Sequence, residues 1–285
     1  MADYIVDSIQ AKLGTLLLGK RMQLHPQVGS TNDLVREAGR QGAPEGLVIL
    51  AEEQVRGRGR LGRTWTAPPG SSILCSVLLR PRFPPRQGFY LTIAASLAIL
   101  GAIRKLTVDV GRWTLDGINQ ITGTKSPIRV PSGRPQSAIK WPNDVLVNGS
   151  KVAGVLCESE FNGGEWAFAV VGFGINVNLP TESFGEMQAT ATSLSAELGH
   201  EIDRAALLAL VLEELEACYL ALQDGQMQPT FQAWADALET LGKRVTVNEP
   251  GGMITGTAMR IDSDGALIVK TDAGTERRVL AGDVS

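Results

Sequence analysis

The sequence has few of the residues from which common metal and nucleophile sites are built. It contains only two histidines, His25 and His200, which lie far apart and next to a proline and a glycine. A histidine-rich zinc site or a Ser-His-Asp triad is therefore not expected. The three cysteines, Cys75, Cys157 and Cys218, are scattered and form no C-x-x-C pair. We expect them to be reduced, mostly buried thiols of a cytoplasmic protein.

Excess positive charge, aromatic residues and long apolar runs are also scarce. The formal net charge is −3 and aromatic residues make up 5% of the chain, so a broad basic surface for nucleic acid is not expected. The N-terminal stretch carries acidic residues early and lacks the basic region of a signal peptide. The longest apolar stretch, residues 91–103, is too short to cross a bilayer and is predicted to be a buried helix. Neither nucleic acid nor a membrane is expected as a partner.

With 285 residues, the chain can form one large domain and a small one. Hydrophobic patterns predict strands and helices in alternation, and Asn148-Gly149 between two apolar runs predicts a hairpin. These hairpins favour an α+β domain with a mixed or antiparallel sheet. The predicted strands cover 21–29, 46–53, 71–80 and 163–179, and the predicted helices begin at 31 and cover 87–106.

The C-terminal part of the chain has a different pattern. Two amphipathic helices are predicted at 203–224 and 228–240, and beyond Gly242 short strands alternate with Gly/Asp turns, which fits a small β-barrel. We therefore predict a main domain over 1–240 and a small domain over 241–285. Residues 107–138 are rich in Gly, Pro, Ser and Thr without periodicity, and are predicted to be a surface insertion.

The stretch "RGRGRLGR", residues 56–63, is here called the arginine loop. Its glycines spell G-x-G-x-x-G, but Pro68-Pro69-Gly70 excludes the helix of a dinucleotide fingerprint, and no acidic residue follows about twenty positions later. Glycine backbone and arginine side chains can instead hold a phosphate or carboxylate. A solvated basic turn or a nucleic-acid patch fits this spacing equally well. Because four arginines this close repel one another, we expect a loop that is mobile when empty.

Four more motifs accompany the loop in a fixed order: "GSTND" at 29–33, "KWPNDVLV" at 140–147, "KVAGVLCE" at 151–158 and "GFGINVN" at 172–178. Together they resemble the biotin–protein ligase family, over about residues 21–285. The resemblance implies a biotin/lipoate ligase-like catalytic domain and a C-terminal SH3-like β-barrel. Only some twenty residues precede the first strand, too few for the winged helix of the family's regulators, so a monofunctional ligase is expected.

The resemblance also implies the reaction and its residues. Biotin and ATP, with Mg²⁺, would form biotinyl-5′-adenylate, and biotin would pass to a lysine of a biotin carboxyl carrier protein, usually a subunit of acetyl-CoA carboxylase. Either a monomer or a homodimer is compatible with the sequence. Catalysis is assigned to Lys140, Arg58 and Arg60. Biotin contacts are assigned to Ser30, Thr31, Asn32, Gln54, Arg58, Gly59, Arg60, Lys140 and Gly154. ATP contacts are assigned to Arg58, Arg60, Lys140, Asn143, Lys151 and Asn176, and Mg²⁺ ligands to Asp144 and Asn176.

Some of these residues also suit a structural role. Ser30 is a favourable N-cap for the helix that follows it, and Trp65 is expected to support the loop from the core. Some family members stack adenine on a tryptophan in the segment that corresponds to "ATATSL", 189–194, and none is present here. The insertion at 107–138 is longer than the compact family pattern requires, and its role cannot be read from the sequence.

Two other functions compete with biotin ligation. A lipoate or octanoyl transferase would share a related fold, but the arginine loop, "KWPND" and the C-terminal domain favour biotin. A non-catalytic biotin sensor or carrier-binding protein would not need Lys140 and two loop arginines. Pyrophosphate release that requires both biotin and ATP would distinguish these alternatives.

Overall fold

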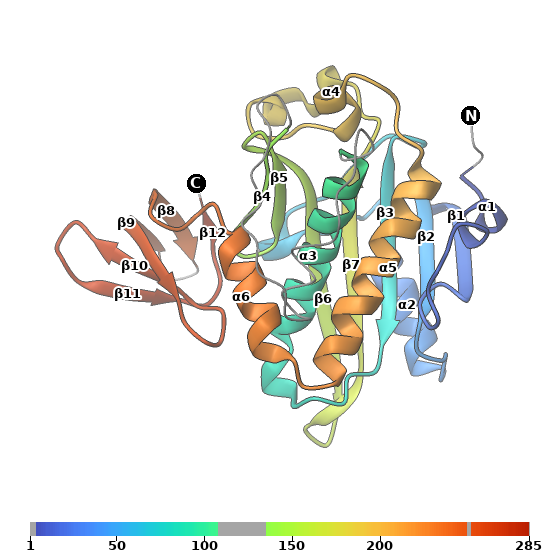
Figure 1. Cartoon of the computed structure of the whole chain (residues 1–285), viewed down its shortest axis with the longest axis horizontal. Coiled ribbons are helices and arrows are strands. Elements are labelled where there is room, and N and C mark those ends of the chain that lie inside the picture. Colours follow the sequence, from blue (N-terminus) through green and yellow to red (C-terminus); the bar gives the residue numbers. More distant parts are fainter. Residues whose placement is uncertain (1–3, 108–134, 250–251, 285) are drawn as a thin grey trace.

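The computed structural model describes residues 4–107, 135–249 and 252–284. Within them, seven strands form a mixed sheet at the centre of the main domain, in the order β1-β2-β3-β7-β6-β5-β4 (Figure 1). Only β1 and β2 run parallel, and the other neighbours are antiparallel. The predicted α+β domain with a mixed sheet is confirmed. The strands are β1 (Arg21–Val28), β2 (Leu47–Gln54), β3 (Ser72–Leu79), β4 (Ser137–Lys140), β5 (Asp144–Val147), β6 (Ser150–Asn162) and β7 (Glu165–Asn176).

Helices cover both faces of this sheet. Along β7, Val171 belongs to the large core on one face, whereas Val170 belongs to a smaller core on the other. The smaller core is covered by α2 (Thr31–Arg40), which packs on β2, β3 and β7. The large core is covered by α3 (Phe89–Leu106), α5 (Arg204–Gln223) and α6 (Met227–Ala237). The two short helices α1 (Val6–Gln10) and α4 (Leu194–Leu198) lie at the periphery.

The apolar character of α3 follows from its position between the sheet, α5 and α6. By length and composition alone, Pro85–Leu106 could cross a membrane, but 61% of its most apolar 18-residue window is buried inside the protein, as in the core helix of a soluble protein. The predicted buried helix at 91–103 is therefore confirmed. Cys75 and Cys218 are also buried and Cys157 partly so, and all three are free thiols, as predicted. Burial raises the pKa of Cys157 and of Cys218 to about 12.

The hairpin predicted at Asn148-Gly149 joins β5 and β6. Both residues adopt positive φ, 50° and 81°, which is the backbone of the tight turns that suit the twist of antiparallel strands. Gly163 and Gly164 do the same between β6 and β7, with φ of 59° and 88°. The second turn joins β6 to β7, and in that pairing Gly154 lies opposite Gly174 and Leu156 opposite Gly172.

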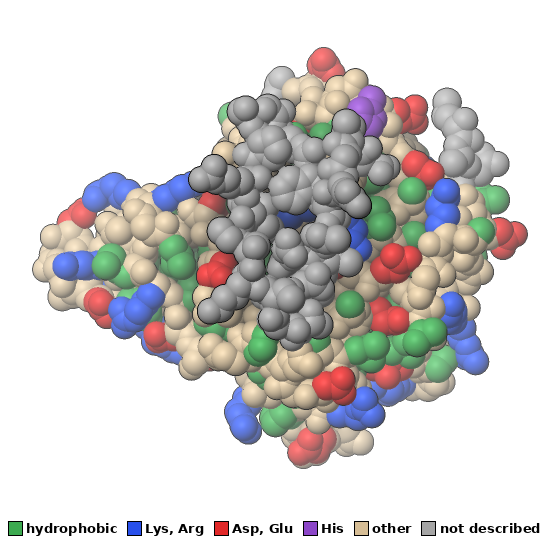
Figure 2. Space-filling view, in the orientation of Figure 1, with side chains coloured by type: hydrophobic (Ala, Val, Ile, Leu, Met, Phe, Trp, Pro, Cys, Tyr) green, Lys and Arg blue, Asp and Glu red, His purple; other side chains and the backbone are tan. Residues whose placement is uncertain are grey.

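The C-terminal residues form a second sheet, which extends to the side of the main domain beyond α6 (Figure 1). Its five strands are antiparallel in the order β11-β10-β9-β8-β12, so the predicted small β domain is confirmed. On the face seen in Figure 2, basic and acidic side chains are mixed over this sheet. Its ion pairs include Arg244–Asp272 and Arg260–Glu276. The strands are β8 (Arg244–Glu249), β9 (Gly252–Ile261), β10 (Leu267–Thr271), β11 (Glu276–Val279) and β12 (Asp283–Val284).

Trp141 attaches the second sheet to the first. Its side chain is only 2% exposed, its indole N–H donates to the Gly265 carbonyl at 2.9 Å, and its backbone N–H donates to Thr240 Oγ1 at 2.9 Å. A cis peptide bond joins Trp141 to Pro142. The "KWPND" motif thus lies where the two sheets meet.

Two predictions at the level of elements need comment. The helix predicted to end at 240 ends at Ala237, because Leu238 is extended and forms a parallel bridge with Ile139 of β4. The predicted insertion at 107–138 lies outside the described residues, apart from Thr107 and residues 135–138.

Candidate active site

A cavity of about 210 Å³ lies on the α2 face of the main sheet. Its floor is formed by β6 and β7, its walls by the start of α2 and the end of β2, and the arginine loop lies over it. Gly282 and Asp283, at the end of the C-terminal sheet, complete one side. Residues from both sheets thus line the cavity.

The structure gathers nearly all the predicted site residues around this cavity. Lys140 is the exception, because it ends β4, pairs with Asp144 in the β4–β5 hairpin and is not among the described residues that line the cavity. A strand-end lysine and a cavity-facing lysine look alike in sequence. The predicted residues that line the cavity are Ser30, Thr31, Asn32, Gln54, Arg58, Gly59, Arg60, Asn143, Asp144, Lys151, Gly154 and Asn176.

Two glycines of β7 make room for the side chains on the floor. A Cβ at Gly172 would overlap Asn32 Oδ1, and one at Gly174 would overlap the indole of Trp65. The floor therefore runs along one face of β7 from Gly172, which we call the Gly172 end, to Asn176, the Asn176 end. Four residues of strand span roughly 13 Å.

Trp65 occupies a different place from the one predicted. We expected it to support the loop from the core, but it lines the cavity, with its ring against Gly174. Its indole Nε1 is buried and has no hydrogen-bond partner among the described residues. In the sequence, Gly174 was the one sign that a large side chain could pack here, and a glycine alone is not specific enough to predict the contact with Trp65.

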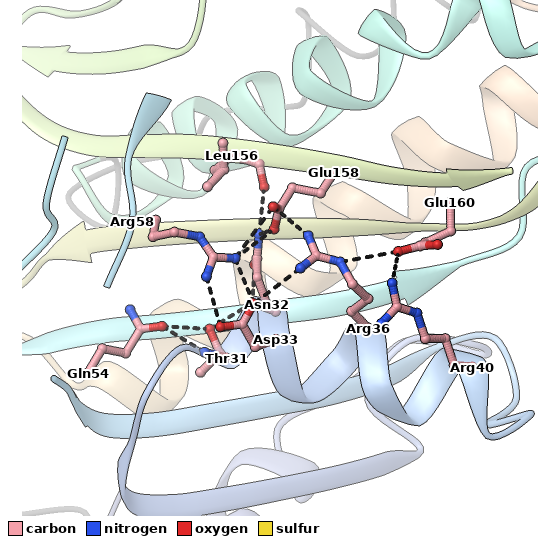
Figure 3. Close-up of polar contacts among 11 residues, drawn as sticks. Thr31, Asn32, Asp33, Arg36, Arg40, Gln54, Arg58, Leu156, Glu158 and Glu160 are labelled. Atoms are coloured by element: carbon pink, nitrogen blue, oxygen red, sulfur yellow. Dashed lines mark hydrogen bonds and ion pairs between the residues drawn. The ribbon is translucent and has the colours of Figure 1, made fainter. Parts of the chain in front are cut away.

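Polar side chains at the Gly172 end form one network (Figure 3). Gln54 Oε1 accepts the Thr31 backbone N–H at 2.7 Å and lies 3.1 Å from Thr31 Oγ1. Ser76 Oγ lies 2.7 Å from Thr31 Oγ1 and 2.6 Å from Asn32 Oδ1. Asn32 Nδ2 donates to Glu158 Oε2 at 2.6 Å. Sequence reasoning missed Ser76, which lies outside the motifs, and Glu158, which ends the "KVAGVLCE" motif but was assigned no role.

The directions of these hydrogen bonds follow from their acceptors. The carboxylate of Glu158 can only accept, so Asn32 must turn its Nδ2 there and its Oδ1 towards the hydroxyl of Ser76. The Ser76 proton then goes to Asn32, and the Thr31 proton goes to Ser76 or Gln54. Thr31 therefore offers only lone pairs to a ligand, and Gln54 offers its amide nitrogen. Both polar atoms of Asn32 are used inside the protein.

Ser30 lies at the N-cap position of α2 without capping it. Its backbone is extended, with φ −156° and ψ 136°, but its side chain makes no cap hydrogen bond. Capping, which the sequence favours at this position, is therefore not the role of this side chain. The residue is 4% exposed and lines the cavity, so its hydroxyl is placed for a ligand.

Three arginines of the loop meet acidic or polar partners from distant elements. Arg58 forms a two-point contact with Asp33, at 2.8 Å from each Nη, which lowers the pKa of Asp33 and raises that of Arg58. Arg60 Nη1 donates to Asn143 Oδ1 at 3.1 Å, and burial lowers the pKa of Arg60. Arg63 pairs with Asp283. From the sequence we expected these arginines to repel one another. That expectation did not include their partners, which are remote in sequence.

Lys151, Asp144 and Asn176 lie towards the Asn176 end. Lys151 Nζ is 2.7 Å from Asp144 Oδ1 and 5.5 Å from the ring centroid of Trp65. Asn176 Nδ2 donates to the Thr192 carbonyl at 3.1 Å, which leaves its amide oxygen for a ligand. This end therefore combines a lysine, an arginine, a carboxylate and an amide around one space.

An aromatic side chain also lines the cavity where none was predicted. The segment 189–194 contains no aromatic residue, but Phe184 comes from the preceding 3-10 segment and packs with Ala191. Both residues line the cavity. Phe184 lies ten residues before Leu194 and outside the motif, so its position could not be inferred from the spacing.

The described residues contain no cluster of three or more His, Cys, Asp or Glu side chains that could hold a metal ion. Mg²⁺ that arrives with a nucleotide needs only one or two protein carboxylates, because phosphates and waters supply its other ligands. The Asp144 carboxylate and the Asn176 amide oxygen suit that requirement.

Comparisons with known proteins agree on a single family. Residues 24–176 match the model of the biotin/lipoate A/B protein ligase family, and residues 240–285 match the biotin protein ligase C-terminal domain. The chain is 35% identical to the biotin–[acetyl-CoA-carboxylase] ligase of Mycobacterium tuberculosis, over 93% of this chain and 88% of that one. It is 29% identical to the bifunctional ligase/repressor BirA of Bacillus subtilis, over 97% of this chain and 77% of that one. The structure of the biotin protein ligase from Aquifex aeolicus in complex with biotin and ATP is similar, with a TM-score of 0.69 and 26% identity over 93% of this chain and 98% of that one.

Proposed function

The chain belongs to the biotin/lipoate A/B protein ligase family and is an ATP-dependent biotin protein ligase, and we propose that its cavity holds biotin and ATP end to end along β7. The ligase forms biotinyl-5′-adenylate and transfers biotin to a carrier lysine. The observation that carries the proposed arrangement is the difference between the two ends of the cavity. At the Gly172 end, uncharged side chains of α2 and β2 line the cavity and Arg58 is paired with carboxylates. Towards the Asn176 end, the cationic side chains Lys151 and Arg60 reach the space.

The Gly172 end suits the ureido ring of biotin. A ureido group has N–H donors and a carbonyl acceptor, and the lone pairs of Thr31 and the amide nitrogen of Gln54 complement them. Ser30 adds a hydroxyl that the helix does not use. Trp65 provides an apolar wall for the rest of the biotin molecule. Asn32 supports this arrangement from behind.

The Asn176 end suits the reacting groups. The carboxylate of biotin attacks the α-phosphate of ATP, and both reactants are anions, so positive charge is needed where they meet. Lys151 and Arg60, which contact the neighbouring residues Asp144 and Asn143, supply it. Lys140, which the motif had suggested for this task, does not line the cavity, and we therefore assign the catalytic lysine to Lys151.

ATP and its metal would occupy the space next to these cations. Asp144 and the amide oxygen of Asn176 would hold Mg²⁺, which when bound neutralises phosphate charge. Asn143 orients Arg60 through the 3.1 Å hydrogen bond between them. Phe184, together with Ala191, gives the adenine an apolar surface in place of the tryptophan found in some relatives.

In the second reaction, the amine of the carrier lysine attacks the carbonyl carbon of the mixed anhydride, and AMP leaves with the electron pair of the broken C–O bond. We propose a biotin carboxyl carrier protein of acetyl-CoA carboxylase as the acceptor, which the name of the Mycobacterium tuberculosis relative supports. We further propose a cytoplasmic enzyme, a monomer or homodimer, with its domain boundary between residues 240 and 241.

A pyrophosphate-release assay tests the proposal. We expect release only when biotin and ATP are both present, and none when lipoate replaces biotin. If lipoate and ATP released pyrophosphate at a comparable rate, the substrate would be lipoate rather than biotin.

A further inference from the structure

We propose that Glu158 of β6 is a positioning residue that couples the arginine loop to the Gly172 end of the cavity, an inference that rests on the proposed function. Its carboxylate lies where these two parts of the site meet (Figure 3). Asn32 Nδ2 donates to Glu158 Oε2 at 2.6 Å, and Arg58 Nη2 lies 3.3 Å from the same oxygen. One acidic group therefore contacts both the arginine loop and Asn32, which supports the Gly172 end.

Arg58 anchors the loop rather than meeting a reactant. Both of its Nη atoms are 2.8 Å from the Asp33 carboxylate, and the second also contacts Glu158. Because two carboxylates occupy these donors, a biotin carboxylate or a phosphate would have to displace an existing ion pair. Arg60, on the same loop, has an amide rather than a carboxylate as its partner, so a reactant would not have to break an ion pair to reach it.

Glu158 reaches the Gly172 end through Asn32. We call its contact with Arg58 the loop arm and its contact with Asn32 the ring arm. Glu158 fixes which way the Asn32 amide points, Asn32 then accepts the Ser76 proton, and Ser76 lies 2.7 Å from the hydroxyl of Thr31. Without the charge on Glu158, the amide of Asn32 loses its strongest acceptor. The lone pairs that Thr31 presents to a ureido N–H then lose their fixed direction.

Glu160, two residues along the same face of β6, provides a matched control. It pairs with Arg40 at 2.6 Å and with Arg36 at 3.5 Å, and no contact joins it to Asn32 or Arg58 among the described residues. Arg36 also pairs with Glu158 at 2.5 Å, so both carboxylates belong to one charge network. Replacing either one removes one negative charge from that network, but only Glu158 touches the two arms.

Limited trypsin digestion of the full chain without ligand tests the loop arm, since the arginine loop contains four cleavage sites. In Glu158→Gln we expect cleavage within residues 56–63 about threefold to fivefold faster than in the wild type, because a partly exposed ion pair has a modest effect. Glu160→Gln should be cleaved at the wild-type rate. Asp33→Asn, which removes the other anchor of Arg58, should be cleaved faster as well.

Calorimetric titration of biotin tests the ring arm. Glu158→Gln should raise the Kd for biotin about tenfold, and Glu160→Gln should leave it unchanged. The proposal is overturned if either measurement fails to separate Glu158→Gln from Glu160→Gln. A wild-type protein that does not bind biotin would refute the proposed function. The digestion needs no ligand, so it would still test whether Glu158 anchors the loop.

Discussion

The ammonium of Lys151 and the carboxylate of Asp144 form an ion pair, 2.7 Å apart, beside the floor of the cavity. The reaction needs these two charges for different partners, because the lysine should face the anionic reactants and the carboxylate should face a metal. We therefore expect the two side chains to separate when the nucleotide binds. The two side chains come from adjacent strands, which the Asn148-Gly149 turn sets in register.

Lys151→Ala should lower the rate of adenylate formation far more than Lys140→Ala. Losing a charged contact that strengthens in the transition state corresponds to on the order of 3 kcal/mol, or about a hundredfold. Single-turnover formation of biotinyl-adenylate measures both variants under the same conditions. If Lys140→Ala showed the larger loss, Lys140 would be the catalytic lysine and our assignment to Lys151 would be wrong.

Phe184→Ala should raise the KM for ATP by about tenfold and leave the Kd for biotin unchanged. The side chain lines the cavity and packs with Ala67, Leu179 and Ala191, none of which is assigned to biotin. Loss of an aromatic surface beside the adenine corresponds to about 0.5–1.5 kcal/mol. Equal losses for ATP and biotin would point instead to a general loss of structure, which a thermal melt would reveal.

Gly174→Ala should weaken biotin binding by at least tenfold, because the added methyl group would overlap the indole of Trp65. Isothermal titration with biotin provides the measurement. Gly149→Ala is a control for the general effect of a methyl group on a glycine, since no atom lies within 4 Å of a Cβ there. That control should lower stability through its positive φ of 81° while leaving the affinity for biotin intact.

Arg60→Gly should release the intermediate faster. The substitution removes a charged side chain from the wall of the cavity and adds backbone freedom to the loop, with a loss of about 2–3 kcal/mol in closure. Dissociation of biotinyl-adenylate should then quicken about thirty- to a hundredfold. The off-rate and the labelling of an added albumin report this change, and an unchanged off-rate without labelling would show that the loop is a static basic turn.

Local patterns in the sequence were sufficient to predict the main elements. The alternation of apolar residues located the strands, and Asn148-Gly149 predicted a turn that the structure places between β5 and β6. The continuous apolar run at 91–103 indicated burial, and α3 lies in the large core. Short elements such as α1 and α4 were missed, because five residues carry too little periodicity.

Contacts between distant segments explain what the sequence could not reveal. Whether Lys140 or Lys151 faces the cavity depends on the side of the β4–β6 strands on which each lies. The position of Trp65 depends on Gly174, 109 residues away. Likewise, the partners of Arg58 and Arg63 are acidic residues from α2, β6 and the C-terminal sheet, so the charge balance of the loop appears only in the folded protein.

The central claim is that this chain makes biotinyl-5′-adenylate in the cavity along β7 and passes biotin to a carrier lysine. The most direct measurement is to incubate the enzyme with biotin and ATP labelled at the α-phosphate, isolate the protein, and add a biotin carboxyl carrier domain. We predict about one labelled biotinyl-adenylate per chain, which the carrier converts to labelled AMP and one biotinylated lysine. A protein that retains no biotinyl-adenylate, or whose labelled adenylate never yields a biotinylated carrier, would contradict the account.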